Sequence, residues 1–491
     1  MWHPENRNFT KPSSRFMQNS YRQKGSYAYL IAIVLVTVIG GLLFGYDTAV
    51  ISGAEKGLQA FFRGAADFDY TDALHGFTTS SALIGCIIGA IISGRLALYL
   101  GRKKTLFVAG ILFLLSALGS YNPEFLFFEK GVACRGLLAA FNGYRILGGI
   151  GVGLASALCP MYIAEVAPAS KRGRLVSWNQ FAIIFGQLVV YFVNFLIIRS
   201  HASDPNVVSW TNAIGCRVMF VSEAVPAGLF SLLILLVPET PRYLAIHGQE
   251  EKALTVLSNI NGEARAMEIL ANIKSTVNAE AKRKHDKLFA FGFLVVFIGC
   301  MLSVFQQIIG INAVLYFAPR IFESMGMGDP MFQTVLMGII NITFTLVAVF
   351  TVEKLGRKPL LITGSLGMAV GAFGVALSNV YTMPALVPVV SIMLYSAFFM
   401  FSCGPICWVY IAELFPNTIR SRATAAAVAF QWVFNFIVSS TFVPMYTRSP
   451  FFAYALYGVI CLVAAVFVWR LVPETKGKTL EEMTKFWREH K

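Results

Sequence analysis

The sequence has little charge and few cysteines, and each shortage excludes a class of protein. Only 13% of its 491 residues are charged, against about 25% in soluble domains. Its eight cysteines form no CxxC pair and no Cys/His cluster, so neither a metal site nor a disulfide framework is predicted. A hydrophobic fraction of 56%, with 42 phenylalanines, excludes a disordered chain. The composition instead predicts a chain solvated by lipid.

Long apolar runs account for most of the chain. A helix needs about 20 mostly apolar residues to cross a bilayer, and reading the runs between polar breaks gives twelve candidates. We therefore predict an all-α membrane protein with twelve transmembrane helices. The expected spans are 28–51, 75–98, 105–120, 143–163, 175–198, 214–237, 289–318, 331–352, 360–379, 384–411, 424–445 and 452–472.

The net charge of +14 would suit a nucleic-acid binder in a soluble chain, but its distribution indicates another role. If the N-terminus lies on the cytoplasmic side, the tails and loops on that side contain 30 of the 40 basic residues. The loops on the opposite side contain eight. Basic residues concentrate on the cytoplasmic side of membrane proteins. We therefore predict a multi-pass protein of the cell (inner or plasma) membrane, with both termini cytoplasmic and no nucleic-acid partner.

Three short motifs recur in the same order in the two parts of the chain, at offsets of 255, 248 and 235 residues. They are GRK at 101–103 and 356–358, EVAPASKRGR at 165–174 and ELFPNTIRSR at 413–422, and PET at 238–240 and 473–475. Such repeats are common in transporters, whose substrates bind between the halves. We predict two parallel six-helix bundles, 28–239 and 289–472, joined by a linker at 240–288 and flanked by tails at 1–27 and 473–491.

The charged residues of these motifs are candidates for a cytoplasmic gate. Their acidic and basic side chains can pair across the bundle when the inner side closes, and breaking the pairs would open it. The alternative is that they only fix orientation in the membrane. The candidates are Arg102, Glu165, Arg172, Glu239, Arg357, Glu413, Arg420 and Glu474.

The linker at 240–288 alternates apolar and charged residues with a helical period, for example Ala253, Leu254, Val256 and Leu257. This pattern predicts short amphipathic helices under the cytoplasmic face. We expect them to brace the two halves. Binding to the membrane surface through their basic residues is the alternative.

Polar side chains in the middle of the spans need a reason, because they are costly in a bilayer. Amides offer two donors and an acceptor, which suits a ligand rich in hydroxyl groups, and aromatic faces suit the C–H groups of such a ligand. Gln180 and Gln187 share one face of span five, as residues seven apart do. Helix-to-helix adhesion is the alternative for any one of them. The rest of the set is Gln306, Gln307, Asn312, Asn341, Trp408, Gln431 and Asn435.

Three charges also lie within the spans, namely Asp47, Arg145 and Glu223. A structural ion pair needs only one acid, and the second acid is what a proton carrier would use. Arginine stays charged and can keep an acid ionised until a conformational change weakens their contact. Desolvation would then favour proton uptake by the acid.

The stretch GGLLFGYDTAVISG at 40–53, FQQ at 305–307 and GIN at 310–312, together with the repeated motifs, resemble the sugar porter family of the major facilitator superfamily over about residues 28–487. The resemblance implies a monosaccharide substrate, with D-xylose expected first and D-glucose or a related hexose second. It places Gln180, Gln306, Gln307, Asn312, Trp408 and Gln431 on sugar-coordinating positions. It places Phe44, Tyr316, Asn341, Gly404 and Trp432 on lining positions, to which we add Gln187.

The resemblance also indicates proton coupling. Facilitative carriers of the family typically have Asn at the position of Asp47, whereas a proton-coupled relative has Asp. We therefore expect proton symport by alternating access, with Asp47 as the proton site, Arg145 as its switch partner and Glu223 as an auxiliary acid. No enzymatic activity, catalytic residue or cofactor is expected, and the protein is expected to be a monomer. A facilitative uniporter and a non-transporting sugar sensor are the alternatives.

Some residues depart from the family pattern. Leu98 and Tyr99 stand where the first cytoplasmic motif usually has an acid or amide followed by Arg. Ser421 replaces a usual Gly, and Cys403 stands where the proton-coupled relative has Trp.

Overall fold

The computed structural model describes residues 25–125, 127–168, 171–201, 203–282, 288–381, 383–416, 418–476 and 480–489. Within these ranges, twelve helical stretches are long and apolar enough to cross a membrane. This confirms the all-α fold with twelve spans. Most of the predicted N-terminal tail lies outside the described residues.

The first six spans form the N-terminal half. The sixth is divided, because a single π-helical turn and a turn at Glu223 interrupt it. The helices are α1 Tyr27–Arg63, α2 Asp72–Tyr99, α3 Arg102–Tyr121, α4 Arg135–Val166, α5 Arg172–Arg199, α6 Val207–Trp210, η1 Thr211–Gly215, α7 Cys216–Ser222 and α8 Ala224–Ile234.

The other six spans form the C-terminal half. The seventh breaks at Ile309–Gly310, and the tenth breaks at Ser402, which has non-helical backbone angles. The helices are α12 Phe293–Ile308, α13 Ile311–Tyr316, α14 Ala318–Ser324, α15 Pro330–Leu355, α16 Arg357–Ser378, α17 Leu386–Phe401, α18 Cys403–Leu414, α19 Arg420–Arg448 and α20 Pro450–Leu471.

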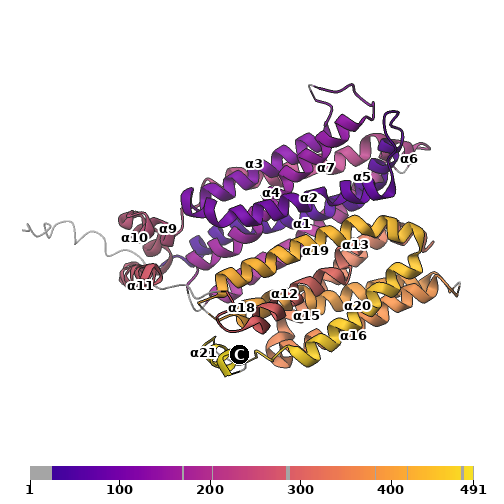
Figure 1. The fold of residues 1–491 in the computed structure, drawn as a ribbon. Coiled ribbons are helices and arrows are strands. Elements are labelled where there is room, and N and C mark those ends of the chain that lie inside the picture. The colour runs from indigo at the N-terminus through magenta and orange to yellow at the C-terminus, as the bar shows by residue number, and fades with distance from the viewer. Residues whose placement is uncertain are drawn as a thin grey trace, which may run out of the picture.

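The described part of the linker contains three helices, as its alternating pattern predicts: α9 Pro241–Ile246, α10 Glu250–Asn261 and α11 Glu263–Lys282. α10 buries its apolar face, and Asn259 accepts a 2.8 Å hydrogen bond from the backbone of Ser26, just before α1. The C-terminal helix α21, Leu480–Glu489, lies at the same end of the molecule (Figure 1). We call this the linker end and the opposite end the loop end.

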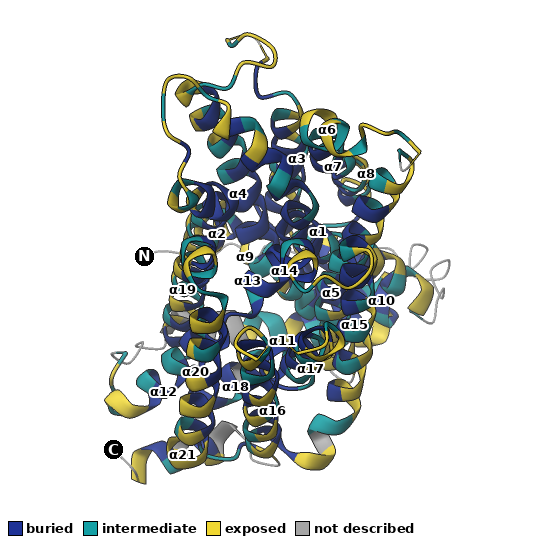
Figure 2. Cartoon of the chain, turned by 90° about the vertical axis from the view of Figure 1, so that its right-hand side faces the viewer, coloured by how far each residue is buried: buried dark blue, intermediate teal, exposed yellow. Residues whose placement is uncertain are grey.

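The two halves lie side by side along the long direction of the bundle (Figure 1). They meet mainly where α2 packs on α19 and where α5 packs on α15. Buried residues gather towards the middle of the bundle, and exposed residues lie on the outward faces (Figure 2). Many of those exposed side chains are large and apolar, including Ile91, Val225 and Phe350, which suits contact with lipid.

The first helix differs most from its expected length. The hydropathy pattern predicts an end near residue 51, whereas α1 continues to Arg63. The extension contains Glu55 and Gln59, which are both buried. Their polar groups are satisfied by side chains from other helices, which hydropathy alone does not reveal.

Candidate substrate and proton sites

A pair of amides joins helices α12 and α19 within the C-terminal half. On α12, the amide Nε2 of Gln306 donates to the backbone oxygens of Cys403 and Gly404, at 2.9 and 3.1 Å. Its Oε1 accepts a 2.6 Å hydrogen bond from Nε2 of Gln431 on α19. These contacts fix the orientation of both amides, because the backbone oxygens can only accept. They leave Oε1 of Gln431 buried without a protein partner among the described residues.

A second amide pair spans the break between α12 and α13. Asn312 Nδ2 donates to Gln307 Oε1 at 2.6 Å. The break itself is supported from α17, because the hydroxyl of Tyr395 donates to the backbone oxygen of Ile309. The broken helix thus brings residues 307 and 312, one on each side of the break, into contact.

The remaining predicted site residues come from both halves. Phe44 on α1 lies against Trp432 on α19, with ring centroids 5.7 Å apart. Asn341 accepts a 2.6 Å hydrogen bond from Ser396. The other lining residues, Tyr316 and Gly404, are also buried. The contact between Phe44 and Trp432 thus joins the two halves within the predicted set.

Gln180 and Trp408 are less closely tied to the other predicted site residues. Both are partly buried, and neither side chain makes a hydrogen bond to the described part of the chain. Gln187 has a buried Oε1 without such a partner. Among the described residues, no hydrogen bond joins these three residues to the Gln306–Gln431 pair.

Several lining residues carry unpaired polar atoms. Within the described residues, no hydrogen-bond partner exists for Asn341 Nδ2, Trp432 Nε1, Gln431 Oε1 or Gln187 Oε1. Buried polar atoms in folded proteins are nearly always paired. Two donors and two acceptors are therefore available to a ligand rich in hydroxyl groups.

The three intramembrane charges lie in the N-terminal half, and two of them are in contact. Arg145 Nη1 on α4 is 2.6 Å from Asp47 Oδ1 on α1, and its Nη2 donates to the backbone oxygen of Asp47 at 3.2 Å. Asp47, Arg145 and Glu223 are each at most 2% exposed. A buried ion pair of this kind is costly to break by removing one partner.

Glu223 is the second acid of this group. It lies at the turn between α7 and α8 and is within electrostatic range of both Asp47 and Arg145. The neighbouring residues tie the helices together, because Tyr46 and Ser222 share a 2.7 Å hydrogen bond. Among the described residues, no N–H or O–H group donates to Oδ2 of Asp47 or to either carboxylate oxygen of Glu223. This group therefore contains one ion pair and a second carboxyl group.

At the linker end, the repeated motifs of the N-terminal half form one cluster. Arg102 Nη2 pairs with Glu165 Oε1 at 2.8 Å, and Thr240 donates to the other oxygen of Glu165 at 2.6 Å. The carboxylate of Glu239 accepts from the backbone N–H groups of Arg102 and Lys103, at 3.0 and 3.1 Å. An acid at a helix N-terminus satisfies N–H groups that the helix leaves unpaired.

The C-terminal half repeats this cluster residue for residue. Arg357 Nη2 pairs with Glu413 Oε1 at 2.9 Å, and Thr475 donates to the other oxygen of Glu413 at 2.6 Å. Glu474 accepts from the backbone N–H groups of Arg357 and Lys358, at 3.1 and 2.9 Å. The matching geometry is what a duplication of the motifs implies.

These pairs lie within each half, not between the halves. The expected pairing across the bundle is therefore not the arrangement of this structure, in which Glu165 and Glu413 each pair with an arginine of their own half. Arg172 is exposed, and Arg420 donates to the backbone oxygen of Phe415 at 3.2 Å. Burial raises the pKa of Glu239, although the backbone N–H groups that it accepts from oppose this rise.

Replacing Gly101 or Gly356 with alanine is expected to destabilise the protein by about 1–3 kcal/mol each. Both have φ near +90° and ψ near 165–170°, a region that is nearly exclusive to glycine. A Cβ at Gly101 would also lie 2.3 Å from Glu239 Oε2. Thermal unfolding in detergent measures the effect. Gly173→Ala is the control, because nothing lies within 4 Å of its Cβ position, and an unchanged midpoint for Gly101→Ala would contradict the prediction.

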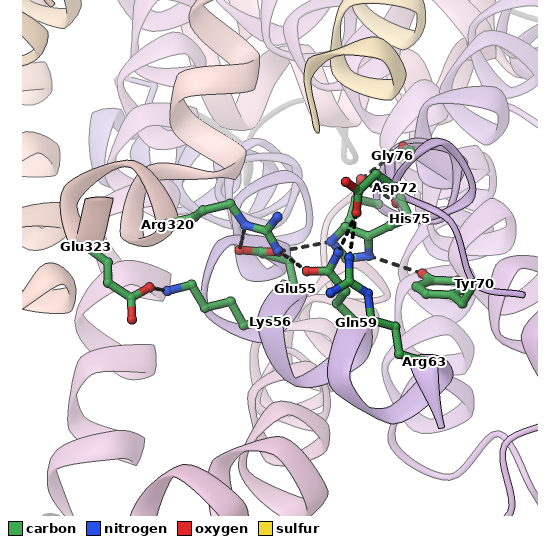
Figure 3. A network of polar contacts seen from close by, with 11 residues as sticks. Glu55, Lys56, Gln59, Arg63, Tyr70, Asp72, His75, Gly76, Arg320 and Glu323 are labelled. Carbon is green, nitrogen blue, oxygen red and sulfur yellow. Dashed lines mark hydrogen bonds and ion pairs between the residues drawn. The ribbon is translucent and has the colours of Figure 1, made fainter. Parts of the chain in front are cut away.

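One set of buried and partly buried polar residues was not predicted from the sequence. Glu55 and Gln59 on α1, His75 on α2 and Arg320 on α14 form a contact network at the loop end (Figure 3). The available signal was a glutamate and a glutamine four residues apart, on one helix face, just beyond an apolar run.

Comparisons with known proteins agree with this architecture. A family model described as "Sugar (and other) transporter" matches residues 33–487. The chain is 46% identical over 478 residues to the D-xylose-proton symporter of Escherichia coli (strain K12), covering 94% of this chain and 96% of that protein. It is 35% identical over 480 residues to the glucose facilitated diffusion protein of Zymomonas mobilis, covering 95% and 99%.

A solved structure extends the likeness to the fold. The inward open conformation of the xylose transporter XylE from E. coli matches with a TM-score of 0.84 and 46% identity, over 93% of this chain and 100% of that one. Both the sequence and the structure of this chain thus match transporters, not enzymes, along nearly their whole length. The chain belongs to the sugar transporter family of the major facilitator superfamily.

Proposed function

We propose that this protein carries a monosaccharide into the cell together with protons, with D-xylose as the first candidate substrate and D-glucose or a related hexose as the second. The observation that carries the proposal is the buried ion pair between Asp47 and Arg145, with Glu223 as a second acid beside it. A relative named as a D-xylose-proton symporter, 46% identical over most of the chain, supports the same function.

The ion pair suggests how the proton is handled. While Arg145 donates to Asp47, the positive charge keeps the carboxylate ionised. A shift of α4 relative to α1 would lengthen their contact, and the desolvated carboxylate would then take up a proton. Glu223, within electrostatic range of both, is a nearby auxiliary acceptor. Proton binding and helix movement are thereby coupled at one place.

The amides and aromatic rings between the halves form the proposed sugar site. Gln306, Gln307, Asn312, Gln431 and Trp408 would coordinate the hydroxyls and pack on the ring, with Gln180 approaching from α5. The unpaired atoms of Gln431, Asn341 and Trp432 supply both donors and acceptors for sugar hydroxyls. The lining is completed by Phe44, Gln187, Tyr316 and Gly404.

We further propose that the linker end is cytoplasmic, with both termini there, and that the protein works as a monomer without a cofactor. The functional division is two bundles at 28–239 and 289–472, a linker at 240–288 and tails at 1–27 and 473–491. We propose that the present conformation is inward-facing, because the chain matches an inward open structure of the E. coli xylose transporter with a TM-score of 0.84 and its arginine–glutamate pairs lie inside each half. Their re-pairing across the bundle would close the cytoplasmic side.

A facilitative uniporter is the second candidate, because a relative at 35% identity is named as a glucose facilitated diffusion protein. Uptake of radiolabelled pentoses and hexoses into proteoliposomes, with and without an imposed pH gradient, separates the two. We expect D-xylose to accumulate uphill when the outside is acidic. Uptake that only equilibrates, whatever the gradient, would favour the uniporter, and sugar binding without flux would favour a sensor.

A further inference from the structure

Charged side chains from both halves meet at the loop end, where α1 and α14 carry residues that contact each other (Figure 3). Arg320 on α14 binds Glu55 on α1 with two hydrogen bonds, from Nε to Oε1 at 3.0 Å and from Nη2 to Oε2 at 2.5 Å. The same Nη2 donates to Gln59 Oε1 at 2.5 Å. Beside this group, Lys56 on α1 pairs with Glu323 on α14. These contacts join the N-terminal half to the C-terminal half.

Burial makes the Glu55–Arg320 pair matter more than a surface ion pair. Glu55 is 0% exposed, and the side chain of Arg320 is 16% exposed. Exposed pairs contribute little because water and salt screen them, whereas separating a buried, two-point pair leaves an uncompensated charge. Bidentate arginine–carboxylate contacts are also among the stronger hydrogen bonds in proteins.

His75 on α2 positions Glu55 from its own half. Its Nε2 lies 3.0 Å from Glu55 Oε2, and its Nδ1 lies 3.1 Å from the hydroxyl of Tyr70. Since an ionised carboxylate only accepts, Nε2 carries the hydrogen. The carboxylate is therefore held in place by α2 and keeps a partner when α14 moves away.

Gly76, which follows His75 on α2, lies at a close contact between the two halves. A Cβ at Gly76 would lie 2.1 Å from the backbone oxygen of Ser440 on α19, so the two helices touch backbone to backbone there. The loop end is therefore closed by both helix packing and charge pairing between the halves. At the linker end, by contrast, the repeated arginine–glutamate pairs stay within each half.

We propose that Glu55, Gln59 and Arg320 form a latch that holds the loop end closed while the linker end is open, and that this latch breaks once in every transport cycle. Its contacts exist only when the two halves meet at the loop end, so it stabilises that conformation over the opposite one. The proposal rests on alternating access but not on the identity of the sugar or of the coupling ion.

Hydrogen–deuterium exchange of the full-length protein in nanodiscs tests the latch, with Arg320→Gln and Glu55→Gln as the variants. We expect each to shift the ratio of loop-end-open to loop-end-closed molecules by about tenfold, given the strength of charged hydrogen bonds. Exchange should then rise in 72–80 and 436–446 at the loop end. It should fall in 101–106 and 410–416 at the linker end, since opening one end closes the other.

Arg217→Gln is the matched control. Arg217 pairs with Glu124 at 2.5 Å and is buried to a similar degree as Arg320, but both residues belong to the N-terminal half. Exchange should therefore not rise at the loop end while it falls at the linker end. The double variant of Glu55 and Arg320 should shift the ratio no further than either single variant. Wild-type exchange in both single variants would overturn the proposal. So would a rise at both ends, which indicates local destabilisation and not a latch.

Discussion

Replacing Asp47 with asparagine is expected to abolish uphill sugar accumulation while counterflow exchange continues. Asparagine has nearly the size of aspartate and can still accept from Arg145, which lies 2.6 Å from the carboxylate. It carries no titratable proton, so the inward movement of sugar loses its link to the proton gradient. In proteoliposomes with an imposed pH gradient, the ratio of internal to external sugar should fall from well above one to one.

Glu124→Gln serves as the control for this substitution. Glu124 is also a buried acid paired with arginine, because its oxygens accept from Arg217 at 2.5 and 2.7 Å, yet it lies outside the proposed proton site. It should keep uphill accumulation. Accumulation by Asp47→Asn at the level of the parent protein would contradict the assignment of Asp47. Loss of counterflow as well would show that the residue is needed for the helix movement itself.

Replacing Gln431 with leucine is expected to weaken sugar binding by roughly 10–100-fold. Gln431 has one buried oxygen without a protein partner, and it holds Gln306 through a 2.6 Å hydrogen bond. Leucine removes the acceptor offered to the sugar and leaves Oε1 of Gln306 unpaired. Losing a partner for a buried polar group costs about 1–3 kcal/mol, which sets the expected range. Equilibrium binding of D-xylose to the purified protein measures it.

The matched control for this variant is Gln333→Leu. Gln333 on α15 is also a buried amide with an unpaired oxygen, but it lies outside the proposed sugar site. Its replacement should leave sugar affinity within about twofold of the parent. Equal losses of affinity in both variants would mean that removing any buried amide weakens binding by disturbing the fold, and not that Gln431 contacts the sugar. Normal affinity in Gln431→Leu would remove this residue from the site.

The sequence allowed much of the architecture to be predicted, because the membrane limits what a chain can do. Apolar runs located the twelve spans, since a bilayer tolerates few other structures. The repeated motifs indicated two halves, and in the structure Arg102 and Arg357 occupy matching clusters with Glu165 and Glu413. The mid-span charges Asp47 and Arg145 were expected to neutralise each other, and they form the ion pair.

Contacts between distant residues could not be read from the sequence in the same way. Hydropathy ended the first span before Glu55, because nothing local shows that Arg320, 265 positions later, binds it. The amide of Gln306 was expected to face sugar, yet it also donates to the backbone at Cys403 and Gly404. Whether the repeated arginines pair within or across the halves depends on the conformation, which the sequence does not specify.

Sugar-driven proton movement tests the proposed symport most directly. Proteoliposomes that contain a pH-sensitive dye, with no imposed gradient and with the membrane potential clamped at zero, receive D-xylose from outside. If sugar and proton share one transport cycle through Asp47 and Arg145, the interior acidifies as sugar enters, and Asp47→Asn abolishes the acidification. Sugar entry without any change of internal pH in the parent protein would contradict proton coupling and identify a uniporter.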